Sequence, residues 1–212
     1  MFSRLPSPPD PFDLRCNVEL WEAEKPFIRV HHSAYGATEF NPGRGVGRFH
    51  PLEVRGTIVP TMYGSNTVDG ALSETIFQRL PSMSSAKYIA ERELMPLVLS
   101  TLRFRRRLRL IQLRGFGMRK LGVTRTQLID SEADQYPVTR AWAAALYDSV
   151  ADADGLIWMS RQHDSSEAVV LFGTRIGRDD LEVAAPPRAL NGDGRSDVAA
   201  AAEAAGITIA TP

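Results

Sequence analysis

The feature that most constrains the fold is a set of short apolar or alternating runs, none of which approaches the roughly 20 apolar residues of a membrane span. Runs of this length between turn residues are typical of strands. Four are clear, at 97–104, 108–113, 155–159 and 168–172. The strongest helix is predicted at 137–150, where Pro137 suits the first turn. Strands and helices together predict an α+β fold.

Composition indicates a globular protein of one domain, with 212 residues of which 43% are hydrophobic and 24% charged. The formal net charge is zero, so no overall field attracts nucleic acid or an anionic membrane. Cys16 is the only cysteine, which excludes an intramolecular disulfide and any cysteine-rich zinc site. No signal peptide is recognised at the N-terminus, and we therefore expect a cytoplasmic protein.

Three regions are predicted along the chain. Residues 1–26 form an irregular lead-in, because five prolines interrupt helix and strand. The core domain spans 27–185. Residues 186–212 form a polar tail with an alanine-rich helix near 197–205 and an edge strand at 207–209.

The first part of the core alternates strands, a loop and a helix. A strand is predicted at 27–32, followed by a loop rich in Gly and Pro at 35–51. A second strand is expected at 56–63, although Pro60 confines it to an edge or a bulge. A helix follows at 67–80, with Glu74 projecting from its edge.

The strands 97–104 and 108–113 are predicted to form a hairpin, joined by three consecutive arginines. With its flanks, this basic segment contains Arg103, Arg105, Arg106, Arg107 and Arg109. Such a run either binds an acidic partner or nucleic acid, or is a solvated turn. The neutral total charge favours the solvated turn.

The densest group of potential ligand-binding residues is Gly43-Arg44-Gly45-Val46-Gly47-Arg48-Phe49-His50-Pro51. Glycines let backbone N–H groups approach a phosphate, and arginine grips it with two parallel hydrogen bonds. The spacing is neither that of a Walker sequence nor that of a dinucleotide fingerprint. Taken alone, the segment is better explained by a surface loop with solvated arginines.

A second motif places Tyr63 at the end of a predicted strand and Glu74 eleven positions later on a helix. This spacing resembles the RES family. The resemblance extends to an arginine in the first core strand (Arg29), to the Gly-Arg-aromatic element Gly47-Arg48-Phe49 before a proline, and to two closing strands. It reaches from about residue 27 to 172. It implies a small mixed or antiparallel split sheet with surrounding helices, as in ADP-ribosyltransferases.

The resemblance also implies an activity, because RES members studied as toxins consume NAD⁺ and are held inactive by an antitoxin. NAD⁺ is then the substrate, inorganic phosphate or water is the acceptor, and no further cofactor is implied. Cleavage of the nicotinamide–ribose bond builds positive charge on the sugar, which a carboxylate such as Glu74 would stabilise. Arg29 and Arg48 would bind the pyrophosphate or the incoming phosphate. Tyr63 would orient the ring or the ribose.

Further residues are assigned through the same resemblance. Gly47 and Phe49 flank Arg48 and are predicted to bind substrate with it. Ser160 is the best match for the serine of the family, and Thr139, near a helix N-terminus where anions are favoured, is the second candidate. Without the resemblance, Glu74 would be read as a solvated helix carboxylate.

Other readings carry less support. The four histidines have no zinc-site spacing, so no metal site is predicted. No Gly-x-Ser-x-Gly elbow is present. Val30 stands where the family resemblance predicts an aromatic residue, which leaves the substrate preference open. The remaining alternatives are ADP-ribosyl transfer to a protein or nucleic acid and a non-catalytic module that binds nucleotides or an acidic partner.

Overall fold

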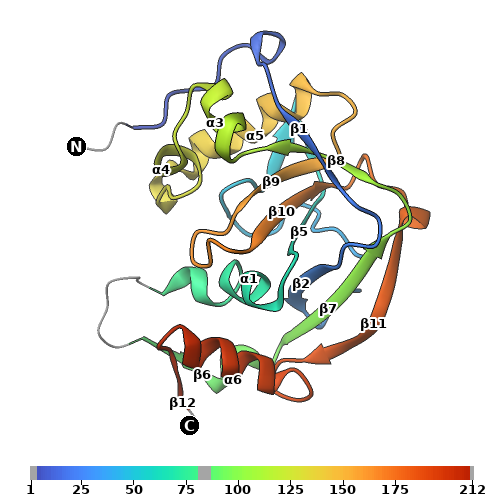
Figure 1. Cartoon of the computed structure of the whole chain (residues 1–212), viewed down its shortest axis with the longest axis vertical. Helices are drawn as coiled ribbons and strands as arrows, with labels where there is room; N and C mark the ends of the chain where they lie inside the picture. Colours follow the sequence, from blue (N-terminus) through green and yellow to red (C-terminus); the bar gives the residue numbers. More distant parts are fainter. Residues whose placement is uncertain (1–3, 81–86, 211–212) are drawn as a thin grey trace.

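The computed structural model describes residues 4–80 and 87–210. Its main element is a mixed eight-stranded sheet that curls strongly (Figure 1), with helices packed around it, so the α+β prediction is confirmed. The strands follow the order β1 (Val18–Trp21), β8 (Leu108–Gln112), β9 (Gly155–Met159), β10 (Glu167–Phe172), β5 (Thr61–Ser65), β2 (Phe27–His32), β7 (Leu97–Phe104) and β11 (Leu181–Ala189).

The sheet nearly divides between β5 and β2. Neighbouring strands are antiparallel except β8 and β9, which are parallel. β5 pairs with β10 over five positions, but its register with β2 consists of Ile28 opposite Ser65 alone. Five strands thus lie on one side of this junction and three on the other.

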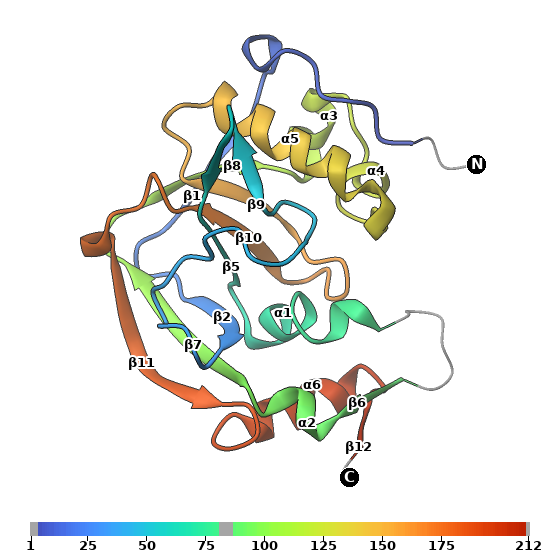
Figure 2. The same cartoon turned by 180° about the vertical axis from the view of Figure 1, so that it is seen from behind.

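Two groups of helices cover the two halves of the sheet (Figures 1 and 2). The helices α3 (Gly115–Leu121), α4 (Arg125–Leu128) and α5 (Tyr136–Ser149) lie at one end, and α1 (Val68–Ser73), α2 (Glu91–Leu94) and α6 (Arg195–Ala204) at the other. Trp142 of α5 belongs to one buried cluster with Trp158 of β9. Leu72 of α1, Leu99 of β7 and Val198 of α6 belong to a second. In both clusters, apolar side chains of the helices and the sheet are buried against one another. This burial removes apolar surface from water and so holds the helices on the sheet.

Short elements complete the chain. In the described part of the chain, four 3₁₀ turns and two small sheets lie outside the main sheet. The turns are η1 (Pro11–Asp13), η2 (Phe77–Arg79), η3 (Ala133–Gln135) and η4 (Arg178–Asp180), and the small sheets pair β3 (Leu52–Val54) with β4 (Thr57–Val59) and β6 (Tyr88–Ala90) with β12 (Thr208–Ala210). Within the described residues, no helix has the length and apolar character needed to cross a membrane.

The predicted hairpin of 97–104 and 108–113 is wrong. Both strands exist, but β7 pairs with β2 and β11, whereas β8 pairs with β1 and β9. The three arginines that join them cross from one half of the sheet to the other. Ion pairs with carboxylates of other segments hold this crossing in place: Arg105 with Glu182, Arg106 with Asp154, and Arg107 with Glu22.

The lead-in 1–26 is not irregular throughout. Its last part forms β1, which pairs with β8, and Trp21 is buried against Phe27 inside the curled sheet. The pairing partner comes from distant sequence, which local patterns do not reveal. Pro60 breaks the predicted strand 56–63 into β4 and β5, which belong to different sheets, because proline lacks the N–H that a central ladder needs.

The predicted helix 67–80 is shorter than expected, because α1 ends at Ser73 and a separate 3₁₀ turn, η2, follows. In the tail, α6 confirms the alanine-rich helix, and β11 crosses position 186, where the core domain was expected to have ended. The last predicted strand is β12, which pairs in parallel with β6 rather than with the main sheet.

Candidate functional site

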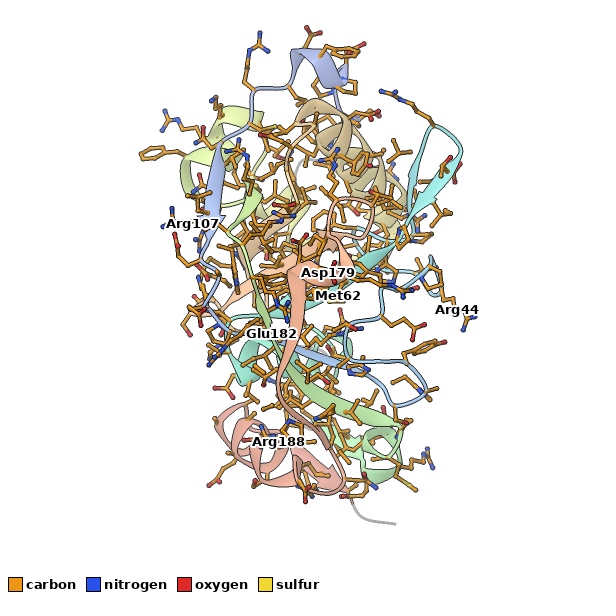
Figure 3. All side chains as sticks on the ribbon, turned by 90° about the vertical axis from the view of Figure 1, so that its right-hand side faces the viewer. Arg44, Met62, Arg107, Asp179, Glu182 and Arg188 are labelled. Atoms are coloured by element: carbon orange, nitrogen blue, oxygen red, sulfur yellow. The ribbon has the colours of Figure 1, made fainter. Side chains whose placement is uncertain are left out.

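A cleft of about 520 Å³ opens beside the junction of β5 and β2. Arg29 comes from β2, Tyr63 from β5 and Glu74 from the end of α1. Figure 3 labels Met62, the neighbour of Tyr63 and itself a cleft residue, in the middle of the molecule. The wall consists of Arg29, Val30, Asn41, Val46, Gly47, Arg48, His50, Thr61, Met62, Tyr63, Glu74, Thr75, Gln78, Glu132, Ala133, Tyr136 and Arg161.

Five of the eight predicted site residues therefore line one cleft, namely Arg29, Gly47, Arg48, Tyr63 and Glu74. Their sequence positions span 46 places, and the curl of the sheet brings them together. Their roles in binding and catalysis stay predictions. The geometry decides what each can do.

Arg29 is 8% exposed, and its Nη1 donates hydrogen bonds to the carbonyl oxygens of Ala37 at 2.9 Å and Glu39 at 2.8 Å. It therefore ties the loop after β2 to the sheet. Its Nε is buried and has no hydrogen-bond partner in the described part of the chain. Burial lowers the pKa of Arg29 to about 10, with Glu39 opposing the shift, so the side chain is still charged at neutral pH.

Arg48 supplies a second buried Nε without a protein partner among the described residues. Its guanidinium lies 6.0 Å from the ring centre of Tyr136, within the range of a cation–π contact. His50, two residues later, has a buried Nδ1 that is also unpartnered there. Buried polar groups in native proteins are nearly always satisfied, whereas these three atoms, all on residues of the cleft wall, have no partner among the described residues.

Position 47 needs a glycine because there is no room for a side chain there, and not because of its backbone conformation. A Cβ at this position would lie 2.3 Å from Cε1 of His50. The Gly47 N–H donates to the His50 carbonyl at 2.9 Å, which closes the turn that presents Arg48.

Tyr63 accepts a hydrogen bond from the Phe49 N–H at 3.1 Å, and its ring meets those of His50 and Trp158 edge to face. Burial raises its pKa well above the ordinary value, so the hydroxyl stays protonated at neutral pH. Since the oxygen accepts from Phe49, the hydroxyl proton is available to a substrate oxygen.

Glu74 is the C-cap residue of α1. At the other end of this helix, the Thr67 side chain accepts from the Gly70 N–H and forms the N-cap. One carboxylate oxygen, Oε1, accepts from the backbone N–H of Arg161 at 3.2 Å. The Arg161 guanidinium is paired in turn with Glu132 at 2.6 Å. The loop after β9 therefore holds the carboxylate through Oε1.

Ser160, Thr139 and Phe49 are not brought to the cleft wall. All three are buried, and each lies directly behind a cleft residue. The Thr139 hydroxyl donates to the Arg48 carbonyl, the Phe49 N–H holds Tyr63, and Ser160 precedes Arg161. The buried Ser160 Oγ has no partner in the described residues. This geometry favours positioning roles over direct contact with a substrate.

Sequence reasoning missed Arg161, Glu132 and Tyr136. Arg161 lies two residues after the end of the strand that resembled the closing pair of the family, which is the one signal available for it. Glu132 and Tyr136 flank η3, and nothing in their spacing indicates a cleft.

The arginines of the basic run 103–109 are paired with carboxylates of this chain and are not free to bind an acidic partner. Besides the three pairs given above, Arg103 lies 3.8 Å from Glu24 and Arg109 lies 2.9 Å from Asp152. Figure 3 shows Arg107 and Arg44 at opposite sides of the molecule. Within residues 4–80 and 87–210, no three His, Cys, Asp or Glu side chains form a group that could hold a metal ion.

The structure therefore has an α+β fold with a cleft in which Arg29 and Arg48 share a wall with the carboxylates of Glu74 and Glu132. The family model of the RES domain matches residues 20–191, and the chain belongs to the RES domain family. A search of curated proteins found no match. Among solved structures, the chain is similar to the M. tuberculosis MbcT–MbcA toxin–antitoxin complex, with a TM-score of 0.55 and 13% identity over 78% of this chain and 84% of that chain. This likeness shows a shared fold.

Proposed function

We propose that this chain is a toxin-type enzyme that cleaves NAD⁺ at the nicotinamide–ribose bond, with inorganic phosphate or water as acceptor. The observation that carries the proposal is the meeting of Arg29, Arg48, Tyr63 and Glu74 in one cleft. The family and the geometry support it, since the two guanidinium groups suit a pyrophosphate and the Glu74 carboxylate suits a cationic sugar.

Binding rests on the arginines. A pyrophosphate carries negative charge on oxygens that accept hydrogen bonds from planar guanidinium groups. Arg29 and Arg48 both line the cleft, where their guanidinium groups can donate to those oxygens. A lysine at either position would supply charge without this geometry.

The bond-breaking step needs little covalent chemistry from the protein. The bond between C1′ of the ribose and the ring nitrogen breaks, and its electron pair leaves with nicotinamide, which becomes neutral. The positive charge then lies on the ribose as an oxocarbenium-like centre. Glu74, with Oε1 held by the Arg161 N–H, stabilises that charge through Oε2.

The acceptor completes the reaction at C1′. A phosphate oxygen gives ADP-ribose phosphate, whereas water gives ADP-ribose and releases one proton to solution. Tyr63, kept neutral by burial, donates its hydroxyl proton in a hydrogen bond to a ribose or phosphate oxygen. Its contact with the Phe49 N–H fixes the direction of that bond.

The test is a product analysis of NAD⁺ incubated with the purified protein, with and without inorganic phosphate. A phosphate-dependent ADP-ribose phosphate product supports phosphorolysis, and plain ADP-ribose supports hydrolysis. Label from the ADP-ribose part retained on a macromolecule would instead support ADP-ribosyl transfer. Intact NAD⁺ under all conditions would overturn the proposal and favour a nucleotide-binding module.

An antitoxin is proposed as the protein partner, because the solved structure of similar fold is a toxin–antitoxin complex. Production of the protein in a bacterial host should lower cellular NAD⁺ and stop growth. An unchanged NAD⁺ pool with normal growth at confirmed expression would contradict the toxin assignment. We further propose that this reaction takes place in the cytoplasm.

A further inference from the structure

A second cavity, of about 260 Å³, adjoins the cleft and shares Arg29 and Asn41 with it. We propose that this cavity, the Tyr35 pocket, binds the adenine ring of the dinucleotide. The inference rests on the proposed function and extends it from the bond that breaks to the far end of the substrate. The pocket is lined by Arg29, Tyr35, Glu39, Phe40, Asn41, Pro42, Arg44 and Gly45.

The size of the pocket suits one ring system. Cavities that enclose a whole drug-sized ligand span roughly 300–1,000 Å³. The Tyr35 pocket is smaller than this range, while the adjoining cleft of about 520 Å³ falls within it. A dinucleotide has two ring-bearing ends joined by a pyrophosphate, and two cavities with buried Arg29 in their shared wall match that layout.

The side chains of the pocket suit a flat base. Unstacked bases lie against aromatic rings and arginine guanidinium planes in protein sites. Tyr35 and Phe40 provide two rings, and the Arg44 guanidinium donates to the Tyr35 hydroxyl at 2.6 Å and lies 5.6 Å from the Tyr35 ring centre. Phe40 is held in place, since a Cβ at Gly173 would lie 2.9 Å from its ring.

The polar groups of the loop leave one acceptor for the base. The acceptor side of Asn41 is engaged, because Oδ1 accepts from the Gly43 and Arg44 N–H groups, and Nδ2 donates one of its two N–H groups to the Arg44 carbonyl. Glu39 accepts from the Gly36 N–H through Oε2. Its Oε1 has no hydrogen-bond partner in the described parts of the chain, and it can accept from the exocyclic amine of adenine.

The orientation of the dinucleotide follows from the position of Glu74. This carboxylate lines the larger cleft and not the Tyr35 pocket. Since Glu74 acts at the nicotinamide-bearing ribose, that end occupies the cleft and the adenine end occupies the Tyr35 pocket. Figure 3 shows Arg44, one of the residues that line this pocket, at the outer edge of the molecule.

The test measures binding of ADP, which has the adenine and the pyrophosphate but no bond that the enzyme would cleave. The double variant Tyr35→Ala with Arg44→Ala should raise the Kd for ADP by about 5- to 100-fold, the range for losing one base–aromatic stack. Inorganic pyrophosphate, which has no base, should bind the parent and the variant within about twofold of each other. Tyr35→Phe keeps the ring and removes only the hydroxyl that accepts from Arg44 Nη1, so it is the matched control, with a small change in Kd.

Two results would overturn the proposal. Equal weakening of ADP and pyrophosphate would show that Arg44 binds phosphate rather than a base. An unchanged Kd for ADP, or no ADP binding by the parent protein, would show that the pocket takes no adenine. A thermal unfolding midpoint equal to that of the parent confirms that each variant is folded.

The outcome is separate from that of the proposed function. If the protein cleaves NAD⁺ but binds ADP without a contribution from the base, the adenine assignment of the Tyr35 pocket is wrong and the proposed reaction stands. If ADP binding depends on the base but NAD⁺ is not cleaved, the adenine assignment stands and the proposed reaction is wrong.

Discussion

The carboxylate of Asp154 is expected to be the main anchor of the crossing between β7 and β8. It accepts from Arg106 Nη1 at 2.9 Å and Nη2 at 2.7 Å, and from the Arg109 N–H at 2.8 Å. Asp154→Ala leaves a backbone donor without its acceptor, which costs about 1–3 kcal/mol. Loss of the two charge-assisted bonds adds less than it would for a buried pair, because the Arg106 side chain is 38% exposed and keeps Asp180. The expected loss of unfolding free energy is about 2–4 kcal/mol.

Urea denaturation followed by circular dichroism measures this loss, and the thermal midpoint should fall by roughly 4–16 °C for a chain of this size. The matched control is Asp152→Ala, because Asp152 pairs with Arg109 at 2.9 Å but its side chain is 67% exposed. An exposed pair contributes at most about 1 kcal/mol. Equal losses for the two variants, or a loss under 1 kcal/mol for Asp154→Ala, would refute the argument that burial of the acceptor decides the effect.

Three further predictions concern packing, pH and the cleft. Gly70→Ala should lower the unfolding free energy by about 1–3 kcal/mol, since the new Cβ would lie 2.1 Å from Ser65 Oγ, and an unchanged urea midpoint would contradict this. Burial, with a smaller contribution from Arg29, holds the pKa of His31 at about 4 in the folded chain. The unfolded chain, with a value of about 6.5, takes up a proton first as the pH falls, so stability is full above pH ~6.5 and up to about 3 kcal/mol is lost by pH ~4. Stability curves from pH 4 to 7 should therefore be flatter for His31→Gln, and parallel curves would argue against it. Tyr63→Phe should lower NAD⁺ turnover about 10- to 100-fold in steady-state assays while NAD⁺ still binds, and full activity would remove the hydroxyl from the mechanism.

The strands and helices were largely predictable from sequence, but their pairing was not. The segments 97–104 and 108–113 have the residue pattern of strands, and the structure confirms both. Their pairing partners come from β1, β2, β9 and β11, and a residue pattern carries no information on which strands meet. The turn arginines are held by carboxylates distant in sequence, so the local appearance of a hairpin misled the prediction.

Only part of the candidate site could be predicted, because residue patterns do not show which distant side chains meet in space. Arg29, Tyr63 and Glu74 could be identified because residue type and spacing resembled a known family. Arg161 contacts Glu74 through its backbone N–H, which any residue could provide, so its identity gives no signal. Ser160 has a suitable hydroxyl in a suitable place along the chain, but only the three-dimensional structure shows that it is buried behind the cleft.

The most direct test of the account compares Glu74→Gln with the matched variant Glu203→Gln, which changes an exposed glutamate of α6. NAD⁺ turnover and NAD⁺ affinity are measured for both. The account predicts that Glu74→Gln lowers turnover by about 100-fold or more, with affinity within a few fold of the parent, and that Glu203→Gln changes neither. Parental turnover in Glu74→Gln would contradict the assignment of this carboxylate to bond cleavage.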